Sequence, residues 1–166
     1  MRNIMRRTMI VAASLVLGIG FAQAEPLRTE KNISLAIAGE LAATAVAECQ
    51  AKGYSVTATV VDRAGQIKAV QRADGASPHT IDASLRKAYT AASMRNNTTA
   101  IMEISQKNPG AQNLGQIDGF LLLGGGMPVR AGDEVIGGIG VGGAPGGHLD
   151  DQCAQAALNK IGDRLK

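Results

Sequence analysis

The sequence predicts a mixed α/β (α+β) domain whose five-stranded, mostly antiparallel sheet is flanked by helices. Three observations support this fold class. Apolar residues recur at helical spacing over residues 32–52 and again over residues 77–94. Between them, residues 56–61 are alternating and rich in β-branched side chains, which is typical of a strand. Glycine-rich apolar stretches after residue 120 indicate further short strands.

The start of the chain has the pattern of a cleavable export signal. A head with three arginines precedes an apolar run over residues 9–21, and Ala22-Gln23-Ala24 offers small residues at the cleavage site. The run is shorter than the roughly 20 residues that a membrane-spanning helix needs. We therefore predict a signal peptide over residues 1–24, one domain over residues 25–166, and a periplasmic or secreted location.

Charge and composition argue against a nucleic-acid partner. The chain has 17 Lys and Arg against 14 Asp and Glu, but the predicted signal accounts for the whole excess. Only Tyr54, Tyr89 and Phe120 are aromatic after the signal, so no stacking platform for single strands is expected. A domain this rich in Ala and Gly should gain stability by association, and we expect a homo-oligomer, either a tetramer or an octamer.

The first half of the domain is expected to contain a helix, a hairpin and a second helix. Gly53 follows the first helix, where a C-terminal glycine belongs. Asp62-Arg63-Ala64-Gly65 has the residues of a tight turn between strands over 56–61 and 66–71. Ser77-Pro78 indicates the start of the next helix, which runs to about Met94.

The second half completes the order α-β-β-α-α-β-β-β-α. Thr98 or Thr99 can cap a short helix that runs through Ser105, and residues 107–116 are predicted as a loop. The remaining elements are three strands over 120–123, 126–130 and 134–141, and a last helix over 149–165.

Cys49 and Cys153 are the two cysteines of the chain. An oxidising compartment would permit a disulfide, and closing a loop of about 100 residues would add up to ~4–5 kcal/mol of stability. Each cysteine also lies on the apolar face of a predicted helix, so two buried free thiols are the alternative. The sequence leaves both alternatives open.

Glycines are concentrated in the last two predicted strands. Residues 138–143 formally contain G-x-G-x-x-G, but the run lies late in the chain and inside an apolar strand, which argues against a dinucleotide site. Residues 123–128 are similarly rich in glycine. Missing Cβ atoms here would let another backbone or a flat ligand approach closely.

His79 and His148 are the histidines of the chain and candidate metal ligands. Each lies near a predicted helix start, where the helix dipole favours the neutral ring that binds metals. His79 follows Pro78, whereas His148 follows two glycines, so a preorganised backbone favours His79. The alternative is a solvated residue of the first turn without a role in a site.

Seven segments in order resemble the GlcG/HbpS family, which is also found as the C-terminal domain of PduO-type proteins. The resemblance covers about residues 33–164 and implies a profilin-like α/β fold. The segments are Val60–Gly65, Arg72–Ala76, Ile81-Asp82, Lys87–Ala91, Gly124–Val129, Gly137–Ala144 and Asp150–Ala154.

The resemblance implies haem as the cofactor and suggests which residues would hold it. In HbpS-like proteins a threonine near the end of the second helix contacts the iron, and Thr98 occupies that place here. His79 stands where a PduO-like histidine ligand would fall. Haem also needs an apolar slot and cations for its propionates. The candidates for the slot and the cations are Gly125, Gly126, Arg72, Arg86 and Lys87.

The resemblance favours a binding protein over an enzyme. The function that we expect is that of an exported haem (tetrapyrrole)-binding protein in haem handling or in haem and redox sensing, with a membrane sensor kinase as a partner. The alternative is a small-molecule redox enzyme or accessory protein linked to glycolate or corrinoid metabolism.

Overall fold

The computed structural model describes residues 27–166, so the predicted signal peptide over residues 1–24 lies outside the described residues. In that part of the chain the strands are β1 (Thr57–Asp62), β2 (Ile67–Arg72), β3 (Gly126–Ala131) and β4 (Glu134–Gly142). The α-helices are α1 (Leu35–Gln50), α2 (Thr80–Met94), α3 (Thr98–Lys107) and α4 (Gly147–Lys160). Two 3₁₀ helices are η1 (Pro109–Gln116) and η2 (Gly162–Leu165).

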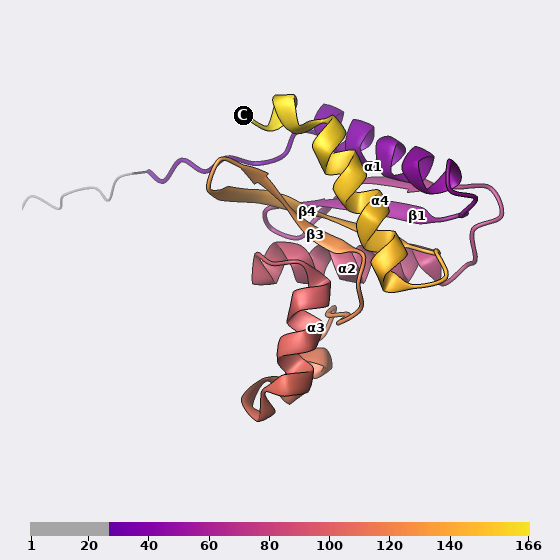
Figure 1. Ribbon diagram of the computed structural model, residues 1–166. Coiled ribbons are helices and arrows are strands. Elements are labelled where there is room, and N and C mark those ends of the chain that lie inside the picture. The colour runs from indigo at the N-terminus through magenta and orange to yellow at the C-terminus, as the bar shows by residue number, and fades with distance from the viewer. Residues whose placement is uncertain (1–26) are drawn as a thin grey trace, which may run out of the picture.

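The strands form one antiparallel sheet in the order β2-β1-β4-β3. Helices α1 and α4 lie side by side on one face and α2 lies on the other, while α3 extends away from the sheet (Figure 1). None of the helices within residues 27–166 is long and apolar enough to cross a membrane. The predicted mixed α/β class with an antiparallel sheet is confirmed.

The predicted number of five strands is wrong, because residues 120–123 are not a strand. Their backbone groups bond to side chains of α2 and α3 instead of to a neighbouring strand. The carbonyl oxygen of Phe120 accepts from Nη2 of Arg86 at 2.6 Å, and the amide of Leu121 donates to Oγ1 of Thr90 at 2.9 Å. The apolar run therefore follows α2 as an irregular segment.

Helix starts differ from the prediction by a few residues. Asn97, and not Thr98 or Thr99, caps α3, because its side chain accepts from the amide of Ala100 at 2.7 Å. Helix α2 begins after His79 at the N-cap and not at Ser77-Pro78. The predicted loop over 107–116 contains η1, and the predicted last helix is divided into α4 and η2.

Glycines of β4 allow α2 to lie directly on the sheet. A Cβ atom on Gly138 would overlap the carbonyl oxygen of Ala88, and one on Gly140 would overlap the carbonyl oxygen of Ser84. Of the two expected uses of these glycines, the close approach of another backbone is the one that the structure shows. No room for a dinucleotide remains between β4 and α2.

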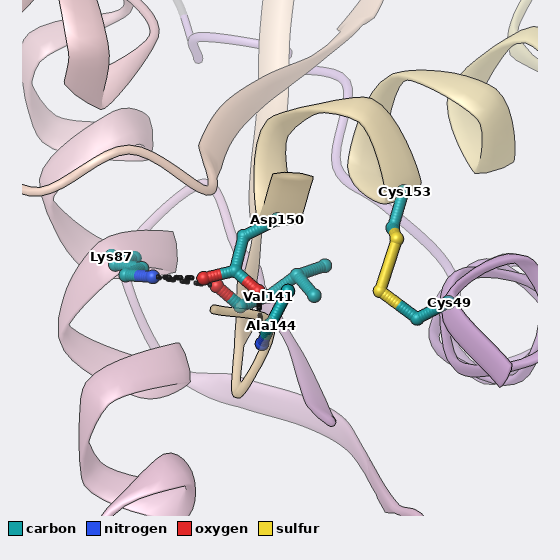
Figure 2. The surroundings of a disulfide bond; sticks show 6 residues. All are labelled: Cys49, Lys87, Val141, Ala144, Asp150 and Cys153. Atoms are coloured by element: carbon teal, nitrogen blue, oxygen red, sulfur yellow. Dashed lines mark hydrogen bonds and ion pairs between the residues drawn. A yellow bond between two sulfur atoms is a disulfide. The ribbon is translucent and has the colours of Figure 1, made fainter. Parts of the chain in front are cut away.

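On the opposite face, a disulfide joins α1 to α4. Cys49 and Cys153 are fully buried, with Cα atoms 5.4 Å apart, and their bond links segments 104 residues apart in the chain (Figure 2). Of the two alternatives that the sequence left open, the disulfide is the one present.

We predict that Gly140→Ala lowers the free energy of unfolding by about 1–3 kcal/mol or more, because the added methyl group forces α2 away from β4. Gly142→Ala is the matched control, since the nearest atom to its added Cβ is 3.6 Å away. The control should change stability by less than about 1 kcal/mol. Urea unfolding measures both, and equal effects would contradict this account of the packing.

We further predict that the double variant Cys49→Ser/Cys153→Ser loses about 2–5 kcal/mol of stability. Thermal unfolding of the wild-type protein with a reductant should approach the curve of the variant, and the reductant should leave the variant unchanged. An unchanged unfolding midpoint in the variant would show that the bond contributes nothing.

Candidate functional site

The seven predicted site residues divide into two groups. Four lie inside the fold where β3, β4, α2 and α4 meet: Lys87, Thr98, Gly125 and Gly126. Three lie outside this region: Arg72 at the end of β2, His79 at the start of α2, and Arg86 within α2.

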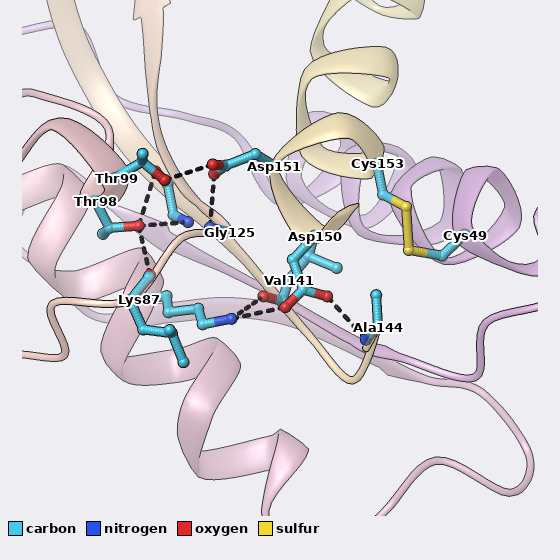
Figure 3. Close-up of polar contacts among 12 residues, drawn as sticks. Cys49, Lys87, Thr98, Thr99, Gly125, Val141, Ala144, Asp150, Asp151 and Cys153 are labelled. Atoms are coloured by element: carbon cyan, nitrogen blue, oxygen red, sulfur yellow. Dashed lines mark hydrogen bonds and ion pairs between the residues drawn. A yellow bond between two sulfur atoms is a disulfide. The ribbon is translucent and has the colours of Figure 1, made fainter. Parts of the chain in front are cut away.

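Lys87 and Asp150 form a buried ion pair that joins α2 to α4. The Lys87 ammonium donates to Oδ2 of Asp150 at 2.8 Å and to the carbonyl oxygen of Val141 at 2.9 Å (Figure 3). The other carboxylate oxygen accepts from the amide of Ala144 at 3.0 Å. Lys87 is 1% exposed and Asp150 is 3% exposed. The ammonium group is thus used inside the fold and does not face a ligand.

Burial raises the pKa of the Asp150 carboxyl, and the attraction of Lys87 offsets part of this rise. A carboxyl whose pKa is raised by folding binds its proton more tightly in the folded state. Its contribution to stability is therefore fully present below its unfolded-state pKa of about 3.9 and is lost as the pH rises through the folded-state pKa.

Thr98 holds the irregular segment that leads into β3. Its hydroxyl donates to the carbonyl oxygen of Leu123 at 2.7 Å and accepts from the amide of Gly126 at 2.9 Å. Thr98 is fully buried. The hydroxyl thus serves inside the fold, and its remaining lone pair is buried away from any ligand unless the surrounding segment moves.

Asp151, the neighbour of Asp150, fixes the same segment from α4. Its carboxylate accepts from the amide of Gly125 at 2.6 Å and from the hydroxyl of Thr99 at 2.5 Å (Figure 3). In the sequence, the family segment Asp150–Ala154 was the one signal that singled out Asp150 and Asp151. Partners such as Lys87 and Gly125 come from segments far away in the chain.

Neighbouring atoms occupy the space beside Gly125 and Gly126 where a side chain would lie. Gly125 has a φ of +117°, and a Cβ atom there would lie 2.8 Å from the Cβ of Asp150 and 2.9 Å from Nζ of Lys87. A Cβ atom on Gly126 would lie 2.5 Å from Cγ2 of Thr98 and from the carbonyl oxygen of Lys87. The space is occupied by the protein itself and is not an open slot.

Arg72 lies on the face of β2 that points toward α2. Arg72 is paired with Thr57, whose hydroxyl is 2.7 Å from that of Thr80 on α2, so Arg72 and Thr57 share this face. By the same register, Ile67 and Val70 also face this side. Helix α2 lies mainly over β1, β3 and β4, and leaves this face of β2 largely uncovered.

A groove of about 570 Å³ lies between α2 and the turn of the β1–β2 hairpin. Ile67 and Leu85 provide apolar walls, and Arg86 provides a cation. The Arg86 guanidinium donates to the carbonyl oxygen of Phe120 and lies 3.9 Å from the carboxylate of Asp82. The groove is therefore apolar along its walls and charged along one rim.

Tyr89 also lines this groove. Its ring lies between Gly65 and Gly119, both at positive φ, where added Cβ atoms would come within 2.6 Å and 3.2 Å of the ring carbons. Phe120 packs against it edge-on, with ring centroids 6.1 Å apart. The ring is thereby held in one position. The prediction of site residues missed Tyr89, although it lies three residues after Arg86 on the same helical face.

The four residues His79, Asp82, Arg86 and Tyr89 follow the spacing i, i+3, i+7 and i+10 along one face of α2. His79 already has helical backbone angles and an exposed side chain at the start of this face. His148 is exposed in the first turn of α4, and neither histidine is among the residues that line the groove. His79 differs in preceding the helix that carries Arg86 and Tyr89.

We predict that Lys87→Met lowers the free energy of unfolding by about 3–5 kcal/mol at neutral pH, because it leaves a buried carboxylate without its partner. The loss should shrink as the pH falls, since Asp150 then takes up a proton. Lys87→Met/Asp150→Asn should recover most of the loss, because the amide oxygen still accepts from Ala144. Denaturant unfolding at several pH values would contradict this if the double variant were as unstable as the single one.

Comparison with known proteins places the chain in a family. The model of the family described as haem degrading protein HbpS-like matches residues 33–159. An uncharacterized 15.0 kDa protein of Citrobacter freundii, from the dhaT-dhaS intergenic region, is 37% identical over 116 residues, which cover 68% of this chain and 80% of that protein.

Two solved structures are also similar. A double variant of HbpS from Streptomyces reticuli has a TM-score of 0.75 at 37% identity, covering 90% of this chain and 98% of that one. The PduOC–haem complex has a TM-score of 0.70 at 25% identity, and the match covers 78% of this chain and 95% of that one. On the family match and these likenesses, the chain belongs to the haem degrading protein HbpS-like family.

Proposed function

We propose that the mature protein binds haem in the groove between β2 and α2 and serves in haem handling outside the cytoplasm. The observation that carries this proposal is the groove of about 570 Å³ whose lining combines apolar side chains with Arg86 and Tyr89. Membership of the HbpS-like family and the likeness to a structure solved with haem support the choice of ligand.

The groove fits the chemical requirements of haem. Its volume lies within the range of about 300–1,000 Å³ that is usual for ligand sites. The walls formed by Ile67 and Leu85 suit the faces of a porphyrin, and Arg86 could pair with a propionate. Arg72 lies on the same side of the sheet, near the other end of α2. Lys87 is held by Asp150 and is a weaker choice.

Two side chains on the outer face of α2 are suitable iron donors. Histidine and tyrosine are both established axial ligands of haem iron. Tyr89 lines the groove and is held by its two glycines, while His79 begins the same helical face. Thr98 remains the donor that the family resemblance suggests, but its hydroxyl already makes two internal hydrogen bonds. Haem bound here would supply redox-active iron.

Export is part of the proposal. The Cys49–Cys153 disulfide supports it, because such bonds persist in oxidising compartments and are rare in the cytosol. The signal pattern over residues 1–24 points the same way.

We also propose a homo-oligomer, a tetramer or an octamer, in which the half-exposed Ile67, Val70 and Ile81 contribute to contacts or to the haem site. Coupling to a membrane sensor kinase is the signalling role that the resemblance suggests.

Titration of hemin into the mature protein tests the proposal. We expect a saturable shift of the Soret band at micromolar hemin, and its absence would refute haem binding. The variant His79→Ala/Tyr89→Phe should lower the affinity about tenfold or more and change the band position, because both proposed donors are removed.

Two controls show where the iron binds. His148→Ala removes the histidine of α4 and should leave the spectrum unchanged. Thr98→Val should lower stability by about 1–3 kcal/mol without changing the Soret position, because it removes only internal hydrogen bonds. A spectrum that changes with Thr98→Val but not with the His79/Tyr89 variant would move the iron site to the family position.

A further inference from the structure

We propose a second binding site for an organic carboxylate with an apolar body, at the junction of α2 with α3. A cavity of about 350 Å³ lies there between this junction, β3 and α4. Arg95 and Arg130 line it together with the amides of Asn96 and Gln155. Met127 and Leu158 supply apolar surface. None of these residues lines the groove proposed for haem.

The charge of this cavity is not compensated by the protein. Seven arginines lie within residues 27–166, and four of them pair with a carboxylate, namely Arg28, Arg63, Arg86 and Arg164. Of the three without such a pair in this part of the chain, Arg95 and Arg130 line the same cavity. No Asp or Glu is among the residues that line it. Two positive charges thus share one cavity without an acidic partner, and an anion would neutralise them.

The backbone fixes these two arginines at the junction. Arg95 ends α2 in the left-handed conformation, with a φ of +54°, and it is the one residue other than glycine with a positive φ in the part of the chain that the structure describes. Nη2 of Arg130 donates to the carbonyl oxygen of Arg95 at 2.7 Å. This bond satisfies the C-terminal end of α2 and holds the Arg130 guanidinium close to Arg95.

The start of α3 adds to the positive potential. Asn97 caps this helix of 10 residues and also lines the cavity. The N-terminal end of a helix dipole is positive, and the neighbouring C-terminal carbonyl of α2 is already bonded to Arg130. The charged rim therefore consists of two guanidinium groups and a helix N-terminus.

The chemistry of the lining selects the class of ligand. Guanidinium groups bind carboxylates through paired hydrogen bonds, and the amide side chains can donate to the same oxygens. The apolar surface from Met127 and Leu158 would contact a hydrocarbon body and gives no advantage to inorganic phosphate. A small monocarboxylate with an aliphatic chain matches both features.

Isothermal titration calorimetry on the disulfide-bonded mature protein tests this site. Hexanoate is the probe. Hexanamide, which lacks the negative charge, tests the need for the charge, and inorganic phosphate tests the need for the apolar chain. We expect saturable binding of hexanoate at one site per chain, weaker binding of phosphate and none of hexanamide. No saturable heat with hexanoate, or equal binding of either comparison compound, would overturn the proposal.

The variant Arg95→Asn/Arg130→Gln should lower hexanoate affinity about tenfold or more, and asparagine is chosen because it tolerates the left-handed backbone. Arg28→Gln/Lys52→Gln removes the same net charge from exposed positions and should bind hexanoate as the wild type does. Equal losses of hexanoate affinity in both variants would show that net charge alone accounts for the effect. Hemin titration of the Arg95/Arg130 variant should be unchanged, and competition between hemin and hexanoate would show that the site is not separate.

Discussion

The close contact between α2 and the glycines of β4 is the constraint on which the rest of the structure depends. Because Gly138 and Gly140 lack Cβ atoms, the backbone of α2 rests on the sheet and the helix cannot rotate without a clash. This fixes which residues face inward and which face outward. Lys87 and Ala88 point into the fold, whereas Arg86 and Tyr89 line the outer groove.

The inward face of α2 is joined to the opposite side of the sheet through α4. Lys87 reaches Asp150 next to the end of β4, and Asp151 holds the segment before β3. The disulfide then ties α4 to α1. Neighbouring residues of one helix thus connect both helical layers, which compensates for a core built mainly from small side chains. The outer face of α2 takes no part in these links between the layers, and its Arg86 and Tyr89 line the groove proposed for haem.

Much of the fold could be predicted from the sequence, because periodicity reports local structure. The hairpin at Asp62–Gly65 and the helix that ends near Met94 were placed within a few residues. Residues 120–123 were misjudged as a strand, since their apolar pattern fits a strand but their backbone partners lie on α2. Hydrogen bonds to distant side chains leave no local pattern.

The candidate site was harder to predict for the same reason. Residue type suggested a cation in Lys87 and a donor in Thr98, but only the tertiary structure shows that both are engaged inside the fold. Tyr89 gains its place from Gly65 and Gly119, which are far from each other in the chain. His79 as an iron ligand and Arg86 as a partner of a propionate stay predictions.

The central claim is that the outer face of α2 is the haem-binding surface. The most direct measurement is anomalous scattering at the iron edge from crystals of the mature protein soaked with hemin. The account predicts an iron peak beside this face, within bonding distance of Tyr89 or His79. An iron peak beside Thr98, or beside the junction that carries Arg95 and Arg130, would contradict it.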